Sequence, residues 1–500
     1  MTKIWKTILD NKILILILMI GAILRFTQLG YSDFQGDEIK ALYLPGLNEN
    51  LIDFLLRQRK GPIQFLVTFV LKFIDPGYQN NFLLRFPFAL AGFTSLIFFY
   101  LYLKRVFNKP VALAATFLLA TNGFFVAFSR IVQYQSFVLL FALVSLCFLK
   151  NKKMVWGYVF WSFSILAHYD GVFIFPLVLY YSIKFAFDPE VSLRNRVTTL
   201  LFSMASFLFL FAFFYLPFVF NISDATKGYW LSRFEGSEES DKISDSAVLF
   251  RVYQPYYAYA LYQFLFYIGL GSLVIRIFDR KRMSSLGGLF IEKFSLPEMA
   301  AFGGWLLVPL YFYEGIMSSP GTHIYSYLLP LFVFIGIGVD LIWVGLKRNQ
   351  LSAAGFAVTV AAVGLFLFSQ SYSVFVDHTQ EYPFERESML VWEFDLPKDK
   401  KYHLNIFGFP YHRNWEGIAD FIEQYPADTY GFSSNENRSI SSLYIKHTEP
   451  KGRPYLFVWI ENPQSFTKKS KIEFKSAPVY IYEKDGQILT KIYLMEPFTP

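Results

Sequence analysis

Eleven apolar runs divide the first 372 residues of this chain, and they constrain its fold more than any other feature. Nine have roughly the ~20 residues that a helix needs to cross the hydrocarbon core of a bilayer. The sequence is 54% hydrophobic, with 59 Phe and 33 Tyr among 500 residues, and its mean hydropathy is +0.35. One soluble core cannot bury that much apolar surface, so we expect a polytopic α-helical membrane protein. The runs are 13–29, 86–104, 111–129, 131–149, 198–220, 256–276, 298–316, 324–346 and 352–371, with a shorter pair at 154–168 and 171–185.

The basic residues between these runs predict the topology. The net charge of +7 is spread over short clusters in alternate loops, which sets membrane orientation and argues against nucleic acid as a partner. The predicted cytoplasmic clusters are Lys3, Lys6 and Lys12; Lys104, Arg105 and Lys109; Lys150, Lys152 and Lys153; Lys184, Arg194 and Arg196; Arg276 to Arg282; and Lys347 and Arg348. We therefore predict a multi-pass protein of the cell membrane with a cytoplasmic N-terminus and an extracytoplasmic C-terminus.

Two segments fall outside this regular pattern. Residues 61–74 are apolar but too short to span, and counting them as a crossing would invert every later basic loop, so we expect an interfacial helix in the first external loop. After residue 372 the sequence becomes mixed charged and aromatic. There HRNWEGIADFIEQY has helical spacing, and PYLFVWI and APVYIYEK have strand character. The predicted domains are a membrane domain, 1–372, and an extracytoplasmic α/β domain, 373–500.

Charged residues at the predicted outer helix ends are the candidate site. Asp37 and Glu38 are adjacent carboxylates just after the first span. Lys60, Arg85 and Arg130 lie at outer loops or helix ends, where they are candidates to bind a phosphate at the interface. The alternative interpretation of the two carboxylates is a solvated loop edge. The alternative interpretation of the three cations is anchoring at the membrane surface.

The segment RQRKGPIQFLVTFVLKFIDPGYQNNFLLRFPFALAGFTSLIFFYLYLKRVF resembles the polyprenyl-phosphate-sugar-dependent glycosyltransferases of GT-C fold. These families comprise the protein O-mannosyltransferases, the aminoarabinose transferases of lipid A and the RgtA-to-D-like group. Their pattern of Lys or His before Pro, and then Arg before Pro, appears here as Lys60 with Pro62 and Arg85 with Pro87. FSRIVQYQSFVLLFALVSL, LAHYDGVFIFPLVLYY and THIYSYLLPLF are similar to later family segments, so the resemblance covers about residues 10–350.

The resemblance implies a role for each of these residues. Asp37 matches the catalytic aspartate and would act as general base on the acceptor hydroxyl, with inversion at the anomeric carbon. Glu38 would assist catalysis by orienting the acceptor or a cationic partner, because adjacent carboxylates repel. Lys60, Arg85 and Arg130 would bind the phosphate of the donor.

A second group of polar residues is predicted to line the sugar or acceptor site. His168, Tyr169 and Asp170 occupy the outer junction of the two short spans, and His323 and Tyr325 precede a late span. A polar hairpin tip and an aromatic belt are the alternative interpretations.

No metal ligand is expected among these residues. Where many relatives have a second Asp after the Arg, this chain has Gln133, Tyr134 and Gln135, and His168 has no second His at ligand spacing. We therefore expect an enzyme that requires no cofactor, although the resembled families include metal-dependent members.

The predicted activity is an integral-membrane inverting glycosyltransferase, of hexosyl or pentosyl type. It would move a sugar from a polyprenyl-phosphate donor to a lipid, glycan or protein acceptor on the extracytoplasmic face. Two alternatives are a lipid-linked oligosaccharide polymerase or ligase, and a lipid-linked sugar transporter, which would more often show inverted repeats or broken helices. A noncatalytic scaffold would not require Asp37, Lys60 and Arg130 on one face.

Overall fold

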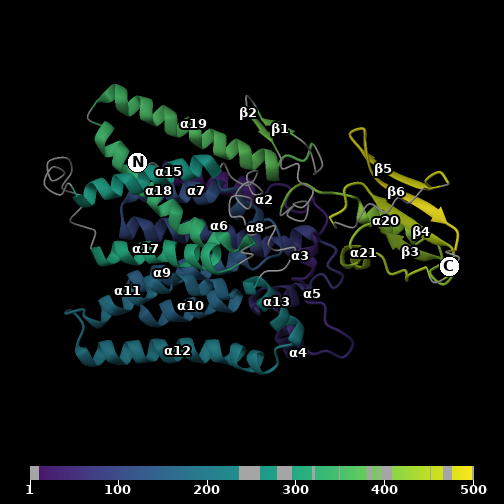
Figure 1. The fold of residues 1–500 in the computed structure, drawn as a ribbon, viewed down its shortest axis with the longest axis horizontal. Coiled ribbons are helices and arrows are strands. Elements are labelled where there is room, and N and C mark those ends of the chain that lie inside the picture. Colours follow the sequence, from purple (N-terminus) through teal and green to yellow (C-terminus); the bar gives the residue numbers. More distant parts are fainter. Residues whose placement is uncertain are drawn as a thin grey trace, which may run out of the picture.

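The computed structural model describes residues 11–235, 259–278, 296–317, 321–347, 349–379, 386–389, 392–395, 408–450, 452–464, 474 and 476–497. A long helical body and a smaller sheet domain lie end to end (Figure 1). The elements of the body are α2 (Lys12–Phe26), α3 (Gly36–Ile39), α4 (Leu51–Arg57), α5 (Ile63–Lys72), α6 (Asn81–Val106), α7 (Lys109–Thr121), α8 (Gly123–Ser129), α9 (Gln135–Lys150), α10 (Met154–Ala167), η1 (Tyr169–Ile174), α11 (Phe175–Ala186), α12 (Leu193–Phe220), α13 (Asp224–Glu235), α15 (Tyr259–Phe278), α17 (Leu296–Tyr311), η4 (Phe312–Ile316), η5 (Gly321–Ile324), α18 (Tyr325–Leu346) and α19 (Gln350–Phe375).

Each of the eleven predicted spans overlaps a helix, or the bent pair α7 and α8, within the described residues. Local sequence explains several helix starts: the side chains of Asn80, Asn108 and Ser192 accept hydrogen bonds from backbone N–H groups in the first turns of α6, α7 and α12. Lys104 and Arg105 lie in the last turn of α6, where positive charge complements the helix dipole.

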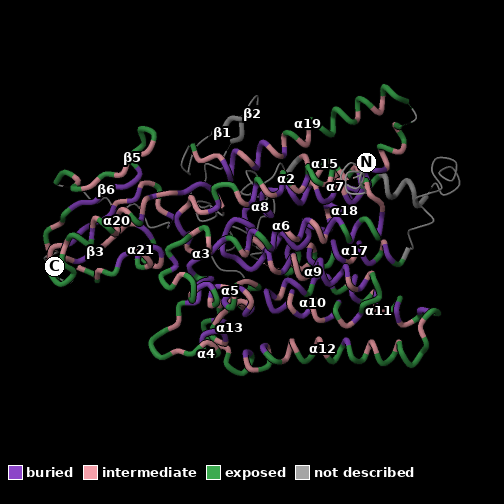
Figure 2. The backbone as a smooth tube through the Cα atoms, turned by 180° about the vertical axis from the view of Figure 1, so that it is seen from behind, coloured by how far each residue is buried: buried purple, intermediate pink, exposed green. Residues whose placement is uncertain are grey.

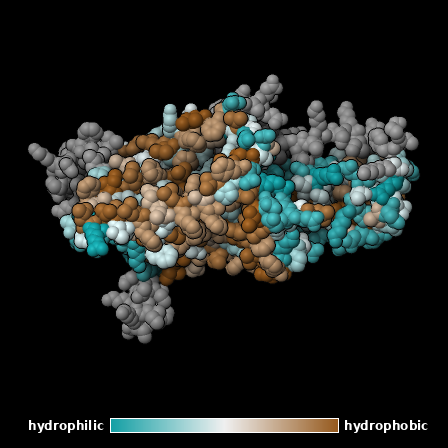
Figure 3. Space-filling model, turned by 90° about the horizontal axis from the view of Figure 1, so that it is seen from below, coloured by the Kyte–Doolittle hydropathy of each residue, from teal (hydrophilic) through white to brown (hydrophobic). Residues whose placement is uncertain are grey.

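Four helices in the described part of the chain are long and apolar enough to cross a membrane, and α7 with α8 makes a fifth span bent by 60°. The four are 81–106, 193–220, 322–346 and 350–375. Apolar side chains cover the helical body, whereas hydrophilic residues gather on the sheet domain and at its junction with the body (Figure 3). The chain is therefore an integral membrane protein.

Helices α12 and α19 flank the body on opposite sides, and their residues are mostly exposed or half-buried (Figure 2). Only 11% of the apolar window of α12 and 6% of that of α19 is buried inside the protein. Their exposed Leu, Phe and Val side chains suit contact with lipid. The shorter helices α9 and α10 lie between them and are largely buried, so tertiary packing supports helices that fall below spanning length.

The C-terminal domain is a small α/β structure, as predicted. A four-stranded sheet has the order β3-β4-β6-β5, in which β3 and β4 are parallel and the other pairs are antiparallel. A separate hairpin, β1 with β2, precedes it. The elements are β1 (Arg386–Met389), β2 (Trp392–Asp395), α20 (Trp415–Ile422), β3 (Gly431–Ser434), α21 (Arg438–Tyr444), β4 (Tyr455–Ile460), β5 (Tyr480–Lys484) and β6 (Gln487–Met495).

The short helices α3, α4, α5 and α13 gather at the end of the body that faces this domain (Figure 1). With 10 residues, α5 is the short helix predicted for the first external loop. One hydrophobic cluster joins Phe34 and Ile39 of that loop to Trp415, Ile418 and Ile440 of the C-terminal domain. The first loop is thus packed against the sheet domain rather than standing free in solvent.

Candidate active site

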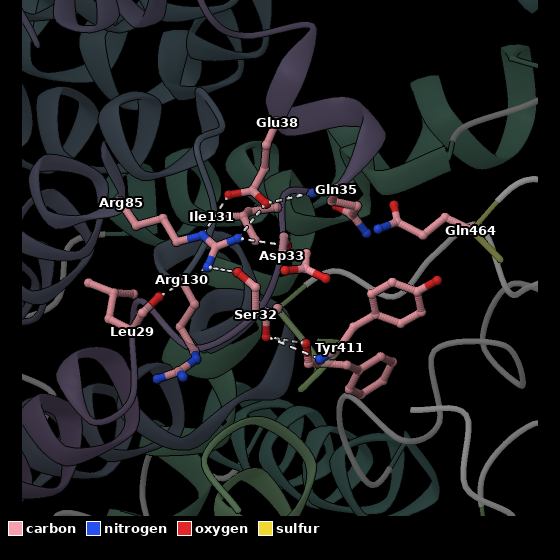
Figure 4. A pocket seen from close by; sticks show the side chains of 12 residues that line it. Leu29, Ser32, Asp33, Gln35, Glu38, Arg85, Arg130, Ile131, Tyr411 and Gln464 are labelled. Atoms are coloured by element: carbon pink, nitrogen blue, oxygen red, sulfur yellow. Dashed lines mark hydrogen bonds and ion pairs between the residues drawn. The ribbon is translucent and has the colours of Figure 1, made fainter. Parts of the chain in front are cut away.

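Glu38 is an anchor in the short helix α3. Its carboxylate receives the Arg85 guanidinium through two short contacts, of 2.8 Å to Oε1 and 2.9 Å to Oε2, and also accepts the backbone N–H groups of Gln35 and Val132 (Figure 4). Both partners of the ion pair are almost fully buried. A buried pair with its remaining hydrogen bonds satisfied fixes geometry, so Glu38 sets the position of α3 relative to α6.

The Arg85 and Arg130 side chains donate hydrogen bonds to backbone carbonyls. Neither lines the larger cavity into which the Asp37 side chain projects. Arg85 also donates to the carbonyls of Leu29, Ser32 and Asp33. Arg130 donates to the carbonyls that end α2, at Leu24, Thr27 and Gln28. Both line a small pocket with Glu38 at the junction with the C-terminal domain (Figure 4).

Asp37 projects to the opposite side of α3, into a larger cavity. Its side chain is 43% exposed and pairs with Lys40 at 3.0 Å. The Gln133 side chain joins Asp37 to Lys60: its amide donates to the Asp37 carbonyl at 2.6 Å, and its oxygen accepts from Lys60 Nζ at 2.9 Å. Lys60 also lies over the Tyr134 ring, 5.0 Å from its centroid.

The charges of this group perturb one another. Burial by itself raises the pKa of Asp37, but the positive charges of Lys60 and Lys40 outweigh burial and hold that pKa below its ordinary value. Burial lowers the pKa of Lys60 to about 8, although the Asp37 carboxylate acts in the opposite direction. At neutral pH the site holds a carboxylate beside an ammonium.

The cavity has a volume of 440 Å³ and is strongly cationic. Five lysine or arginine residues and one carboxylate, Asp37, line its described wall. The cations are Lys40, Arg57, Arg59, Lys60 and Arg233. Such a wall fits an anionic ligand, because its excess positive charge attracts and stabilises a phosphate.

Part of this wall was missed by the sequence analysis. Helix α13 contributes Tyr229, Trp230 and Arg233, and Arg59 lies over the Tyr229 ring at 4.6 Å. Arg233 donates to the Tyr229 hydroxyl at 2.7 Å. The available signal was a short segment with two cations and three aromatic residues, DATKGYWLSRFE.

Residues from the predicted sugar or acceptor group form another part of the wall. His168, Tyr169 and His323 line the cavity, and the His168 ring stacks on Tyr134 at 3.9 Å between centroids. Asp170 and Tyr325 are buried and do not belong to the lining.

Asp170 connects the two histidines from behind. Its carboxylate lies 3.2 Å from His168 Nδ1 and 2.8 Å from His323 Nδ1, and accepts the Tyr313 hydroxyl at 2.6 Å. The structure thus places a second histidine, His323, beside the same carboxylate as His168. Sequence spacing did not reveal it, because His323 is 153 residues from Asp170.

Comparison with known proteins supports the class of fold. Residues 63–215 match the family PMT_2, described as dolichyl-phosphate-mannose-protein mannosyltransferase. ArnT from Cupriavidus metallidurans in the apo state is 13% identical with a TM-score of 0.50, over 97% of this chain and 98% of that chain. The form bound to undecaprenyl phosphate is 12% identical, also with a TM-score of 0.50, over 96% and 98%.

The chain has the GT-C fold. The Archaeoglobus fulgidus oligosaccharyltransferase AglB, in complex with an inhibitory peptide and a dolichol-phosphate, is 12% identical with a TM-score of 0.47, over 95% of this GT-C protein and 62% of that chain. No curated protein sequence matches it. The predicted resemblance and the predicted fold class are confirmed.

Proposed function

We propose that this GT-C protein is an inverting glycosyltransferase that moves a sugar from a polyprenyl-phosphate carrier to an acceptor hydroxyl at the extracytoplasmic face of the membrane. The observation that carries this proposal is the cavity in which Asp37 lies beside Lys60, linked through Gln133, within a cationic wall. The cavity is lined by residues of α3, α5 and α13, and these short helices gather at one end of the helical body (Figure 1). A phosphate anchored in the bilayer would reach the site at that end.

In the proposed reaction, Asp37 is the base. Its carboxylate takes the proton of the acceptor hydroxyl while the acceptor oxygen attacks the anomeric carbon. The bond between that carbon and the phosphate oxygen breaks, and polyprenyl phosphate departs with the bonding electrons. Attack from the face opposite the phosphate inverts the anomeric configuration, and no covalent glycosyl-enzyme forms.

Lys60 and Arg233 are the proposed phosphate ligands. Both face the cavity, and their charges offset the negative charge that grows on the departing phosphate. Arg85 and Arg130, which the sequence analysis also assigned to the phosphate, are engaged with Glu38 and with backbone carbonyls, so we assign them to positioning the loop. ArnT, whose fold this protein shares, has been solved bound to undecaprenyl phosphate, which supports a carrier of this class.

The cofactor requirement is part of the proposal. The charges that act on Asp37 are those of Lys60, Lys40 and Arg233, and the stretch in which many relatives have a second Asp holds Gln133, Tyr134 and Gln135. A cationic side-chain set can neutralise the leaving phosphate directly, so we propose that the transfer step at Asp37 needs no divalent ion.

The test begins with the donor. Mass spectrometry of lipids that copurify with the protein should detect a monosaccharide on a polyprenyl phosphate. Lys60→Ala and Arg233→Ala should each weaken donor binding ~10-fold to 100-fold, since a hydrogen bond to a charged group contributes ~1.5–3 kcal/mol. Lys72→Ala, a lysine of α5 outside the cavity, is the control.

Two results would redirect the proposal. An oligosaccharide on the copurifying carrier would favour the polymerase or ligase alternative. Movement of a labelled carrier across vesicles without transfer to any acceptor would favour a transporter.

A further inference from the structure

Three ligand-type side chains from distant parts of the chain meet behind the cavity wall. His168, Asp170 and His323 each offer one ligand atom, and these atoms all lie within 4.8 Å of one another. Two of the separations are 3.2 Å, from His168 Nδ1 to the Asp170 carboxylate, and 2.8 Å, from His323 Nδ1 to the same carboxylate. Ligand atoms that share one four-coordinate ion lie roughly 3.4 Å apart, given bonds of ~2.0–2.2 Å, so small side-chain shifts would suffice.

The carboxylate at the centre of this group is short of positive charge. Asp170 is 3% exposed, and no lysine or arginine in the described part of the chain lies within 4.0 Å of its oxygens. Its close neighbours are the two imidazoles and the Tyr313 hydroxyl. A buried carboxylate is costly unless it is paired or coordinates a metal ion, and a divalent cation would supply the missing charge.

Neighbouring rings hold the histidines in place. Tyr134 stacks on His168 with 9° between the ring planes, and Tyr313 stacks on His323 with 12° between them. Tyr313 also donates its hydroxyl to Asp170. Outer residues that fix the rings and the carboxylate of a ligand set are typical of functional metal sites.

Two members of the ligand set reach the wall of the cavity. His168 and His323 belong to the cavity wall, whereas Asp170 lies behind it. The Tyr325 hydroxyl is buried close to Asp170. A set of three protein ligands leaves the fourth position of a tetrahedral zinc ion without a protein ligand, as in catalytic rather than structural zinc sites.

We propose that His168, Asp170 and His323 bind one divalent transition-metal ion, with Zn²⁺ as the preferred cation. Two imidazole nitrogens and one carboxylate oxygen favour Zn²⁺ over Mg²⁺ or Ca²⁺, which prefer oxygen ligands. The site is separate from the Asp37 carboxylate, and its test does not depend on the proposed transfer reaction.

The experiment measures metal content directly. The full chain, purified with a tag that contains no histidine and without chelator, is loaded with Zn²⁺, desalted and assayed by inductively coupled plasma mass spectrometry. We expect about one equivalent per chain. His323→Ala and Asp170→Asn should each reduce retention to below ~0.1 equivalent, since even the loss of a supporting residue weakens metal affinity ~10-fold to 100-fold. His447→Ala, in the C-terminal domain, should retain the full amount.

The wild-type measurement decides the proposal even if the variants misfold. Retention below ~0.1 equivalent by the loaded, monodisperse wild-type protein would overturn it and leave a hydrogen-bonded array of Asp170 with two histidines. A folded His323→Ala protein that retains as much Zn²⁺ as the wild type would also overturn the proposal. Zn²⁺, and not Mg²⁺, should raise the thermal midpoint of the wild type, and Asp170→Asn should abolish that rise.

Discussion

Asp37 and Glu38 are neighbours in sequence, but the fold places them in opposite environments. Glu38 is 1% exposed and bound by Arg85, whereas Asp37 is 43% exposed and faces Lys40 and the cavity. A short helical turn separates the two side chains, so one carboxylate supports the loop while the other is free to meet a substrate. This division gives each residue a different expected response to substitution.

Asp37→Asn should abolish transfer without unfolding the protein. Asparagine keeps the size of the side chain but cannot accept the acceptor proton, so kcat should fall by at least ~100-fold, a typical size for lost general-base catalysis. The rate is measured with a verified donor and acceptor in detergent. Asp53→Asn, an exposed carboxylate in the first turn of α4, should keep normal turnover. Near-normal turnover by Asp37→Asn would place the base elsewhere.

Glu38→Gln should act on stability first. It leaves the Arg85 charge buried without its partner, which costs ~3–5 kcal/mol when one member of a buried pair is removed. The thermal midpoint of the variant in detergent should fall clearly, while that of Asp37→Asn should change little. Equal midpoints for Glu38→Gln and the wild type would show that the ion pair does not support the fold.

The pKa of Lys60, about 8, predicts an alkaline limb in the pH profile. The ammonium that binds phosphate is present below that pH and is lost as the pH rises through it, so kcat/KM for the donor should fall above about pH 8. Asp37, whose pKa is held below its ordinary value, stays ionised throughout this range. Lys60→Arg keeps its charge to far higher pH and should remove the limb. A limb that persists in Lys60→Arg belongs to another group.

At the scale of elements, α3 is held from both sides. Arg85 of α6 binds Glu38, and the C-terminal domain binds the preceding residues. Gln464 accepts from the Gly36 N–H at 3.2 Å and donates to the Phe34 carbonyl at 3.1 Å. The backbone of Arg413 donates to the Asp33 carboxylate. These contacts make the C-terminal domain part of the support for the Asp37 loop.

Gln464→Ala should therefore lower turnover from a distance. It removes two hydrogen bonds to the loop, each contributing ~0.5–1.5 kcal/mol, so a loss of roughly 10-fold in kcat is expected. Donor affinity should change less, because Lys60 and Arg233 do not contact Gln464. Gln424→Ala, an exposed residue just after α20, is the matched control. An unchanged kcat in Gln464→Ala would show that contact with the C-terminal domain does not position the Asp37 loop.

At the scale of the whole molecule, the short helices that line the cavity, α3, α5 and α13, lie at the end of the helical body that faces the C-terminal domain (Figure 1). On the face that Figure 3 shows, hydrophobic residues dominate the body and hydrophilic residues dominate the domain. The basic loops predict that this end faces away from the cytoplasm.

Cysteine labelling tests that orientation. Lys153→Cys and Asp428→Cys place single thiols at exposed positions in the α9–α10 turn and in the C-terminal domain. Background labelling should be low, because Cys147 is the chain's one cysteine and is buried. An impermeant reagent added to intact cells should label Asp428→Cys and not Lys153→Cys. Labelling of both, or of Lys153→Cys alone, would contradict the predicted orientation.

The sequence by itself determined the class of protein and most of its elements. Hydropathy, basic loops and helix caps are local properties of the chain, so the helices that overlap the eleven predicted spans, the short helix α5 and the strands β4 and β5 could be predicted without any long-range contact. Asp37 and Lys60 could be paired as candidates because both lie in the loop between the first two predicted spans.

Only the tertiary structure decided which polar groups meet. Arg85 binds Glu38 across 47 residues, and His323 reaches Asp170 across 153. Arg233 joins the cavity wall from α13. No local pattern encodes these meetings, because they depend on how the helices pack. That packing brings Arg85 and Arg130 against the backbone of the loops that they support. It also brings together His168, Asp170 and His323, which come from segments far apart in the sequence.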